Sequence, residues 1–461
     1  MDISLREVLI AAQGHLDGKF IKKTKINHVS TDSRHIQKGD IFFALKGPRF
    51  DGHDFVESVI EKGAEWVVVD EKIFETRSHR VRERLIYVKN TLKAYGDLAH
   101  FYRKKFTIPF IALTGSSGKT TLKELLGHIL SADFEVLKNQ GTENNLIGVP
   151  KTLFQLEKKH EVCVLEMGTN QPGEIDRLSA IIDPDIGIIT QIGAGHLAGL
   201  KNLNGVKKEK LSLLRHIPSH GHLIINAEDK NLRRVKVSRF RTHRVSLSVP
   251  GCDFIARKMV YKNGETSFFV GKKDFFSTQL LGEHNVTNIL LAIAAAKILG
   301  IGEVTLKKRL ASFKAVKGRL SSLTRKGRHF LDDSYNANPI SFRASLDILK
   351  RLKVRGRKIL VCGDMLELGL EEMKWHRRIG RTAAGIGLSL IIAVGPLSKV
   401  LSKEAVRSGF SSKNIFYADN SLKAGQLCLK WSQPGDTILL KGSRGMAMEK
   451  VLECFTAGST R

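Results

Sequence analysis

The residues from Ile111 to Thr121 (Ile-Ala-Leu-Thr-Gly-Ser-Ser-Gly-Lys-Thr-Thr) have the types and order that bind nucleotide phosphates. Gly115 and Gly118 let backbone N–H groups approach a polyphosphate without a Cβ in the way. Lys119 can reach the outer phosphates, and the Thr120 hydroxyl can coordinate Mg²⁺. The stretch therefore predicts binding of ATP or GTP.

The elements on either side of this loop support the interpretation. An apolar run over residues 108–113 predicts a buried strand, and residues 120–131 predict a helix whose N-terminus favours an anion. The glycines are separated by two residues, where the general motif has four. An ordinary Gly/Ser turn is the alternative, and the strand–loop–helix setting argues against it. The predicted nucleotide-binding residues are Gly115, Ser116, Ser117, Gly118, Lys119, Thr120 and Thr121.

Two further side chains sit where predicted parallel strands end. Glu166 closes the run Val162-Cys-Val-Leu165, and an acid at that position beside a phosphate loop can hold Mg²⁺. A turn or capping acid is the alternative. His196 follows the predicted strand 185–190, in a loop that faces the ligand crevice of an α/β sheet. Its imidazole can complete a metal shell, although a solvated histidine is the commoner case.

Three other polar stretches carry chemistry. Asn285 and Asn288 open a predicted helix over 285–299; capping is the simple role for Asn285, and an Asn amide can also match an adenine edge. Residues 332–339 (Asp-Asp-Ser-Tyr-Asn-Ala-Asn-Pro) follow a strand, and a turn alone does not need two acids, a Tyr and two Asn. Residues 441–445 (Lys-Gly-Ser-Arg-Gly) place an arginine at a strand end, where it suits a carboxylate or phosphate.

Length and composition bound the class of protein. The 461 residues, 42% of them hydrophobic, allow about two to four domains with substantial cores. No apolar run reaches the ~18 residues of a membrane span, and the charged start lacks a signal-peptide pattern, so we expect a cytoplasmic protein. Five scattered cysteines indicate reduced thiols.

The chain is strongly basic, with 75 Lys and Arg against 46 Asp and Glu and a net charge of +29. Residues 230–244 are the densest basic segment, which permits nucleic-acid binding. They lack interleaved aromatic residues beyond Phe240 and any nucleic-acid fold signature. We therefore favour a solvated basic surface, with nucleic acid as an unlikely partner.

Alternating strands and helices predict an α/β protein of three domains. Residues 1–106 form a smaller N-terminal α/β unit, with strands at 41–45 and 66–69 and a helix at 54–62. Residues 107–317 form a central phosphate-loop domain on a parallel sheet, with shorter β pieces over 245–281. Residues 318–461 form a doubly wound, Rossmann-like sheet. Its expected strands lie near 328–332, 357–362, 389–394, 413–417 and 436–441.

These motifs together resemble the Mur ligases, the ATP-dependent amide-forming enzymes of peptidoglycan precursor synthesis, over nearly the whole chain. The phosphate loop is similar to that family's shortened form, which accounts for the glycine spacing. Residues 31–34, 39–42 and 52–55 (Thr-Asp-Ser-Arg, Gly-Asp-Ile-Phe and Gly-His-Asp-Phe) resemble the uridine-nucleotide-binding domain of two members.

Stretches in the last third indicate which member the chain resembles. Residues 332–339, 363–369 (Gly-Asp-Met-Leu-Glu-Leu-Gly) and 441–446 resemble the ligase that adds the terminal dipeptide. The resemblance implies ATP and Mg²⁺ as cofactors, UDP-MurNAc-tripeptide and D-Ala-D-Ala as substrates, and a monomer. The ligase for the third residue and a folylpolyglutamate-synthase-like ligase are the nearest alternatives. A nucleotide-switched nucleic-acid-binding protein and a catalytically dead scaffold are the alternatives from other classes.

The resemblance also implies roles for individual residues. Thr120 and Glu166 would hold one Mg²⁺, with Glu166 and His196 on a second. Lys210 falls where the family carries a carbamoylated lysine that serves as a further metal ligand; spacing alone favours a solvated helix face shared with Lys207 and Lys208. The implied catalytic set is Lys119, Glu166, His196 and Lys210. Asn285, Asn288, Arg319 and Asp333 would contact ATP. The substrate set is Ser33, Lys46, Arg49, Asn145, Tyr335, Asn336, Asn338, Ser443 and Arg444.

Overall fold

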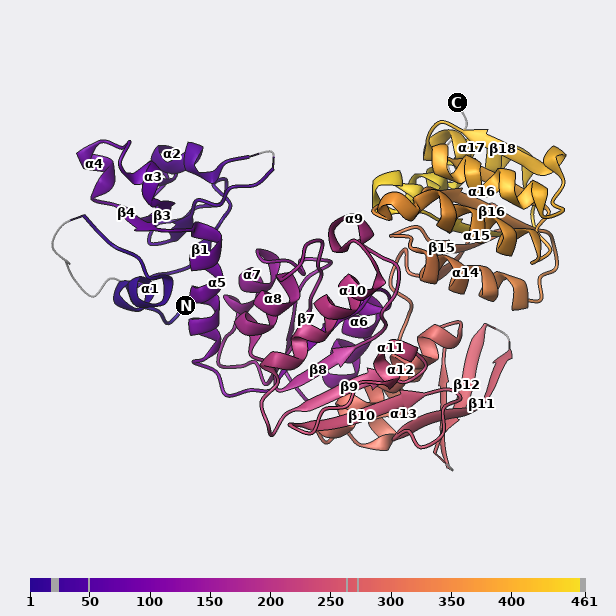
Figure 1. The fold of residues 1–461 in the computed structure, drawn as a ribbon, viewed down its shortest axis with the longest axis horizontal. Helices are drawn as coiled ribbons and strands as arrows, with labels where there is room; N and C mark the ends of the chain where they lie inside the picture. Colours follow the sequence, from indigo (N-terminus) through magenta and orange to yellow (C-terminus); the bar gives the residue numbers. More distant parts are fainter. Residues whose placement is uncertain (18–24, 49, 263, 272, 457–461) are drawn as a thin grey trace.

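The computed structural model describes residues 1–17, 25–48, 50–262, 264–271 and 273–456. The chain builds three sheets in succession, each flanked by helices, and the three units lie side by side (Figure 1). The protein has the three-part α/β architecture that the alternation of strands and helices predicted.

The N-terminal sheet is parallel, with strand order β1-β2-β3-β4. Its strands are Val29–Ser30, Ile41–Phe43, Trp66–Asp70 and Leu85–Val88. The helix expected at 54–62 begins as a 3-10 turn over Gly52–Phe55 and continues as α2 (Val56–Glu61). The unit's other helices are α1 (Leu5–Ala12), α3 (Glu71–Phe74), α4 (His79–Arg82) and α5 (Thr91–Arg103).

The central sheet has the order β13-β12-β11-β10-β9-β8-β5-β7-β6, parallel except where β12 pairs with its two neighbours. Its strands are Phe110–Thr114, Val136–Lys138, Val162–Glu166, Ile186–Ile189, His222–Asn226, Arg241–Ser246, Phe254–Lys262, Glu265–Val270 and Asp274–Thr278. Its helices are α6 (Lys119–Leu130), α7 (Gly148–Leu153), α8 (Glu174–Ile182), α9 (Leu197–Leu200), α10 (Leu203–Leu211), α11 (Lys230–Arg233), α12 (Glu283–Ile298) and α13 (Glu303–Ser312).

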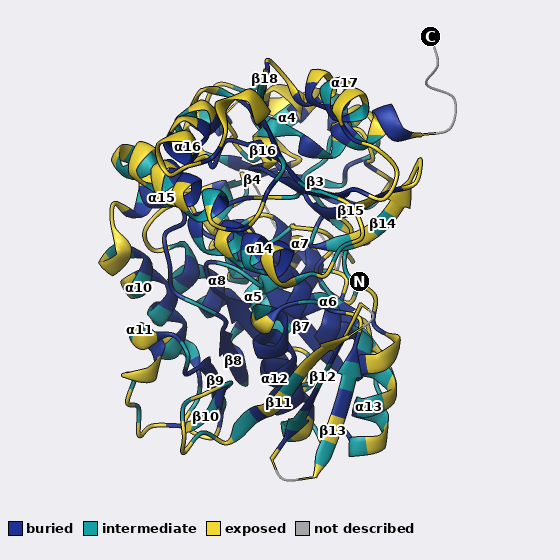
Figure 2. Cartoon of the chain, turned by 90° about the vertical axis from the view of Figure 1, so that its right-hand side faces the viewer, coloured by how far each residue is buried: buried dark blue, intermediate teal, exposed yellow. Residues whose placement is uncertain are grey.

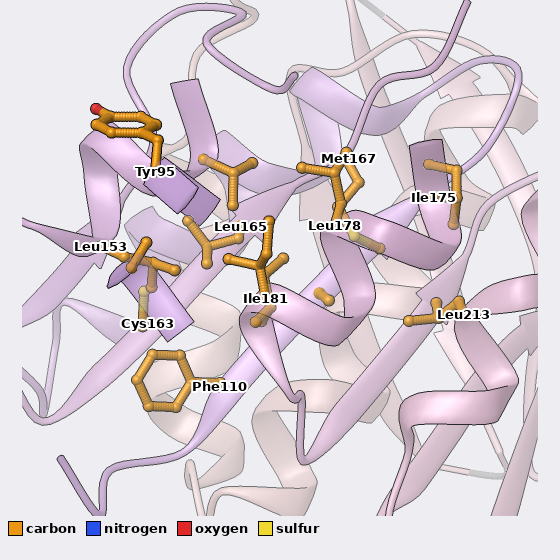
Figure 3. Close-up of a cluster of buried hydrophobic side chains, with 14 of the residues drawn as sticks. Tyr95, Phe110, Leu153, Cys163, Leu165, Met167, Ile175, Leu178, Ile181 and Leu213 are labelled. Atoms are coloured by element: carbon orange, nitrogen blue, oxygen red, sulfur yellow. The ribbon is translucent and has the colours of Figure 1, made fainter. Parts of the chain in front are cut away.

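Buried apolar side chains hold this sheet between two helical layers. On one face, α8 and α5 pack over strand residues such as Phe110 and Leu165, as Figure 3 shows. On the other face lies α12, which is apolar on nearly all sides and buried along most of its length (Figure 2). A helix without a polar face must be enclosed by protein, so α12 forms part of the core on this face of the central sheet.

The C-terminal sheet has the order β14-β15-β19-β16-β17-β18, and β14 alone runs antiparallel to its neighbour. Its strands are Ser321–Arg325, Arg328–Asp333, Lys358–Gly363, Leu390–Val394, Ile415–Ala418 and Thr437–Lys441. Five of them match the strands expected from the sequence to within a few residues, and β14 was not expected. The main helices are α14 (Pro339–Arg351), α15 (Glu372–Ala384), α16 (Pro396–Arg407) and α17 (Ser421–Trp431).

The polar motifs follow strand ends at the boundary between the central and C-terminal units. The phosphate loop follows β5, Glu166 ends β7, and the His196 loop follows β8. The stretch that begins at Asp332 ends β15 and faces them. None of the helices in the described ranges is both long and apolar enough to cross a membrane.

Candidate active site

The conformation of the phosphate loop requires two glycines, because a Cβ at either position would clash with a neighbouring side chain. Gly118 has φ +84°, and a Cβ there would lie 2.6 Å from Asn288 Oδ1. A Cβ on Gly115 would lie 1.9 Å from Thr190 Oγ1. The Ser116 hydroxyl is shared with the main chain of Gly193, at 3.0 Å from both its N and its O. Ser116 N also donates to Gln191 O at 2.8 Å, so the β5 and β8 loops brace one another.

Lys119 begins helix α6 and folds back over the loop, where its Nζ donates to Gly115 O at 2.9 Å. The surrounding protein lowers the pKa of Lys119, and the carboxylate of Glu166 opposes that shift. The hydrogen bond to Gly115 keeps the ammonium over the loop, and its role toward a phosphate chain stays a prediction.

Glu166 is almost fully buried and is fixed by two asparagines that the sequence analysis missed. Asn139 bonds both main-chain groups of Glu166, and Asn144 Nδ2 donates to its Oε1 at 2.8 Å. The other oxygen, Oε2, has no hydrogen-bond partner among the described residues. Both asparagines lie in the polar run that follows β6, and this run was the sequence feature that could have indicated them. One lone oxygen aimed into a buried site is what a metal ligand requires.

Lys210 is buried, at 1% exposure, so the prediction of a solvated helix face was wrong for this residue. Lys208 on the same helix is exposed, as expected. Nζ of Lys210 has no partner within the described part of the chain. Burial lowers its pKa well below the usual range, and the charge of Lys119 adds to that effect. Burial thus favours the neutral amine over the ammonium, and the neutral amine is the form that reacts with CO₂.

His196 lies at the N-terminus of α9 with φ +56°, a backbone conformation that is uncommon for a residue with a side chain. Its Nδ1 is 2.8 Å from Glu367 Oε2 in the C-terminal unit, an ion-pair distance without hydrogen-bond alignment. The imidazole lowers the pKa of Glu367. Ala198 N also donates to Glu367 O, so this contact joins the two units. It was not predicted from the sequence.

The side chains around Glu166 fit Mg²⁺. Mg²⁺ takes one or two carboxylates and completes its shell with phosphate and water oxygens. The unpartnered Glu166 Oε2 and the Thr120 hydroxyl are groups that would contribute to such a partial shell.

Residues of the C-terminal unit reach directly onto the phosphate loop. Arg319 Nη2 donates to Thr120 Oγ1 at 3.1 Å, and Asn338 Nδ2 donates to Ser116 O at 2.9 Å. Tyr335 OH donates to Thr142 Oγ1 at 2.7 Å. The guanidinium of Arg319 also lies 3.9 Å from the centre of the Tyr335 ring, a cation–π contact. The loop that begins at Asp332 thus forms a lid over the phosphate loop.

Replacing Arg319 with lysine is expected to lower turnover about tenfold to a hundredfold while the fold is retained. Lysine keeps the charge but loses the planar fork that serves Thr120 and the Tyr335 ring together. The change is checked by steady-state ATP turnover, with the exposed Arg325 of the neighbouring strand replaced by lysine as the control. Equal ATP turnover rates for the two variants would show that Arg319 has no role in the active site.

Behind this lid lies a buried ion pair. Lys441 Nζ is 2.5 Å from Asp333 Oδ2 and donates to Asn336 O at 3.0 Å. Ser345 Oγ donates to the same carboxylate. The Asp333 carboxylate is therefore bonded by groups of its own domain, and its contact with ATP stays a prediction.

A cleft of about 1320 Å³ opens beside the phosphate loop, between the central and C-terminal units. Ser117, Gly118 and Asn288 line its inner end. Asn288 Nδ2 donates to Asn285 Oδ1 at 3.3 Å, and Asn285 Nδ2 donates to Leu281 O. The capping role considered for Asn285 is wrong, because α12 begins at Glu283 with Gly282 at the cap.

His284 stands beside these asparagines on the cleft wall and was not predicted from the sequence. The surrounding protein lowers its pKa to about 4, although the Asp333 carboxylate opposes this. The imidazole is thus neutral at physiological pH and adds no charge to the cleft.

The remaining predicted substrate residues are distributed over all three units. Ser443 Oγ accepts from Leu366 N at 2.9 Å and donates to Ala337 O at 3.2 Å, which joins all three C-terminal motifs. Arg444 pairs with Glu449 at 3.0 Å and lies 5.5 Å from the Tyr335 ring centre. Asn145 accepts from Gly148 N at 2.8 Å and so serves helix α7.

The N-terminal candidates lie together on the first sheet's loops. Ser33 O accepts from Lys62 Nζ at 2.8 Å, and Lys46 Nζ lies 3.4 Å from Asp51 Oδ2. Arg49 lies outside the described residues. The hydroxyl of Ser33 and the exposed ammonium of Lys46 remain available to an anionic ligand.

Comparison with known families defines the class of this architecture. Three family models match in order: the Mur ligase family catalytic domain over residues 25–103, the Mur ligase middle domain over 113–296, and the Mur ligase glutamate ligase domain over 318–444. The chain belongs to the Mur ligase family.

Full-length relatives narrow the assignment within that family. The chain is 34% identical to the UDP-N-acetylmuramoyl-tripeptide--D-alanyl-D-alanine ligase of Escherichia coli, over 100% of both chains. It is 31% identical to the ligase of that name from Bacillus subtilis, over 98% of this chain and 97% of the relative. Its sequence therefore groups with this type of Mur ligase.

Solved structures agree with these relatives. A crystal structure of MurF from Acinetobacter baumannii superposes with a TM-score of 0.87 at 32% identity, covering 97% of each chain. MurF from Thermotoga maritima, solved in complex with ADP, gives 0.83 at 27% identity, over 94% of this chain and 98% of that one. The fold and the order of the three units are thus those of the Mur ligases.

Proposed function

We propose that the protein is an ATP-dependent ligase that joins D-alanyl-D-alanine to UDP-MurNAc-tripeptide, giving UDP-MurNAc-pentapeptide for peptidoglycan synthesis. The observation that carries the proposal is the position of the stretch 332–339, whose Asn338 contacts the phosphate loop. That stretch belongs to the part of the chain that resembles dipeptide-adding ligases. The stretch therefore places the proposed dipeptide site next to the loop that would bind the phosphates of ATP.

In the first step, the free carboxylate of the tripeptide attacks the γ-phosphorus of ATP. The bond between that phosphorus and the β–γ bridging oxygen breaks, and ADP leaves with the electron pair. Lys119 and Arg319 offset the charge that develops on the transferred group. Mg²⁺ on Thr120 and Glu166, with a second ion on Glu166 and His196, would neutralise phosphate charge when bound, and a carbamate on Lys210 would complete that shell.

In the second step, the amine of D-Ala-D-Ala attacks the acyl phosphate. The new C–N bond forms, the C–O bond to phosphate breaks, and the amine proton leaves to solvent. Tyr335, Asn336, Asn338, Ser443 and Arg444 surround the dipeptide in this proposal. The lid excludes water that would otherwise hydrolyse the acyl phosphate.

The remaining assignments follow from this reaction. The N-terminal unit, residues 1–106, binds the UDP-sugar with Ser33 and Lys46 among its contacts. Residues 107–317 bind ATP, with Asn288 and its neighbour Asn285 at the adenine. Residues 318–461 carry the dipeptide site. The protein acts as a monomer.

The basic segment 230–244 favours this ligase over a nucleic-acid-binding protein. Arg233, Arg239 and Arg244 donate to the main-chain oxygens of Ala227, Arg215 and Val235. Guanidinium groups that hold the fold in this way are less available to a phosphate backbone. The segment therefore serves, at least in these three arginines, the structure of the central unit.

Phosphate release from Mg·ATP tests the proposal. We expect release only when UDP-MurNAc-tripeptide and D-Ala-D-Ala are both present, with a product heavier by the dipeptide in mass spectrometry. Diaminopimelate in place of the dipeptide serves as the acceptor control. Release that is indifferent to the dipeptide, or stimulated by DNA instead, would refute the assignment.

A further inference from the structure

Glu209, which directly precedes Lys210, is buried and has both carboxylate oxygens engaged. Its Oε1 accepts from Ile175 N at 2.7 Å and from Thr169 Oγ1 at 3.2 Å. Its Oε2 accepts from Gly173 N at 2.7 Å. All three donors belong to the loop after β7 and to the start of α8. The carboxylate makes no hydrogen bond to the Lys210 amine, although its charge acts on that amine.

Helix α10, which carries both residues, has little apolar surface to hold it in place. The structure describes the whole helix, and its buried residues are Val206, Glu209 and Lys210. Val206 contributes on the order of 2 kcal/mol from the hydrophobic effect, and Leu211 adds a partly buried contact with the core. Polar anchors add to this small apolar contact, and a carboxylate on the free N–H groups of a helix start is a strong one.

The anchor point is itself rigid. Helix α8 packs Ile175, Leu178 and Ile181 into the core on the sheet face, as Figure 3 shows. Thr169 lies three residues after Glu166 on the loop that leaves β7. Glu209 thus links the helix that carries Lys210 to the strand end that carries Glu166.

We propose that Glu209 is a positioning residue, which ties the last turn of α10 to the start of α8 and so holds the Lys210 amine in the phosphate site. Lys119 and Glu166 lie within electrostatic reach of that amine. The consequence for turnover rests on the proposed ligase function, whereas the placement of Lys210 does not. Neither the family matches nor the motifs that identify the family assign Glu209 a role.

The test compares Glu209→Gln with Glu174→Gln in the full chain. Glutamine at 209 keeps the size but presents an NH₂ group to the N–H donors of Gly173 or Ile175. Glu174 is a control for the loss of charge, because its carboxylate, like that of Glu209, acts electrostatically on the Lys210 amine. It also accepts two main-chain N–H groups of this loop, from Asn170 and Gln171. In the structure those bonds stay within the loop and α8 and do not involve α10.

Chemical labelling of lysines by reductive methylation, read by mass spectrometry, reports the position of Lys210. We expect labelling of Lys210 to rise at least about tenfold in Glu209→Gln and to stay at the wild-type level in Glu174→Gln. Lys123 serves as an internal reference, because it is buried and donates to Asn139 O and Gly141 O. We also expect turnover to fall about 10–100-fold in Glu209→Gln alone, the usual cost of losing an outer-shell partner.

Two results would overturn the proposal. One is unchanged protection of Lys210 in Glu209→Gln. The other is a parallel rise at Lys123, which would mean that Glu209 serves the fold of the whole central unit. A wild-type protein that released no dipeptide-dependent phosphate would refute the proposed function instead, and the labelling result would still decide the role of Glu209.

Discussion

Replacing Lys119 with methionine is expected to lower dipeptide-dependent phosphate release by at least about a thousandfold. Methionine keeps the length of the side chain and removes its charge. The Lys119 ammonium is held over the loop by Gly115 O, at the place where the γ-phosphoryl group would pass. Charge that develops there during transfer would lose its nearest fixed cation, and water cannot substitute for it inside a closed site.

The measurement is steady-state phosphate release with saturating substrates, together with ATP affinity from calorimetry. The loss should fall mainly on kcat, because the backbone N–H groups of the loop still bind the phosphates. Lys208→Met is the control, since Lys208 is an exposed lysine of the same unit. Retention of more than a tenth of the wild-type rate in Lys119→Met would show that this lysine does not stabilise the transferred group.

The phosphate loop and the order of strands and helices were predictable because their causes are local. Each of these features has a sequence pattern within about ten residues. Examples are a glycine at a positive φ, an apolar run of strand length and a helix with an apolar face. The strands β15, β16, β17 and β19 accordingly lie within a residue or two of their predicted positions. The loop at Gly118 likewise takes the conformation that its sequence implied.

Lys210 shows where local pattern failed. Its helix reads as polar on all sides, so a lysine there looks solvated. Lys210 is nevertheless buried, and the neighbouring Glu209 is bonded to the loop at 169–175. Only the family resemblance marked Lys210, because a contact between residues about forty positions apart has no periodic signature.

The same reason explains the missed partners of the site. Asn144 meets Glu166 across two neighbouring strands, and Glu367 meets His196 across the boundary of two units. Asn144 and Glu367 each lie in a polar loop that follows a strand. Such a loop indicates a functional site but does not show which residues contact one another. Pairings depend on sheet order, and in the central unit the order β8-β5-β7 places loops together that are distant in sequence.

Replacing Lys441 with methionine is expected to destabilise the C-terminal unit by about 3 kcal/mol, the lower end of the cost of breaking a buried ion pair from one side. The Lys441 side chain is 1% exposed, and it neutralises Asp333 at 2.5 Å. Methionine fills a similar volume but leaves the carboxylate buried with Ser345 as its remaining side-chain donor. Hydrogen exchange of β15 and β19 should then accelerate about a hundredfold.

The double variant Asp333→Asn/Lys441→Met separates loss of packing from loss of the charge pair. It removes both charges, so its destabilisation should stay within about 1–2 kcal/mol of wild type and below that of Lys441→Met alone. A double variant as unstable as the single one would mean that Lys441 contributes through its bond to Asn336 O and its packing, and not through Asp333. Asp333 and Asn336 both lie on the lid, so the ion pair also sets the shape of the surface that closes over the phosphate loop. We therefore expect Lys441→Met to lose ligase activity at temperatures where its exchange-protected core is still folded.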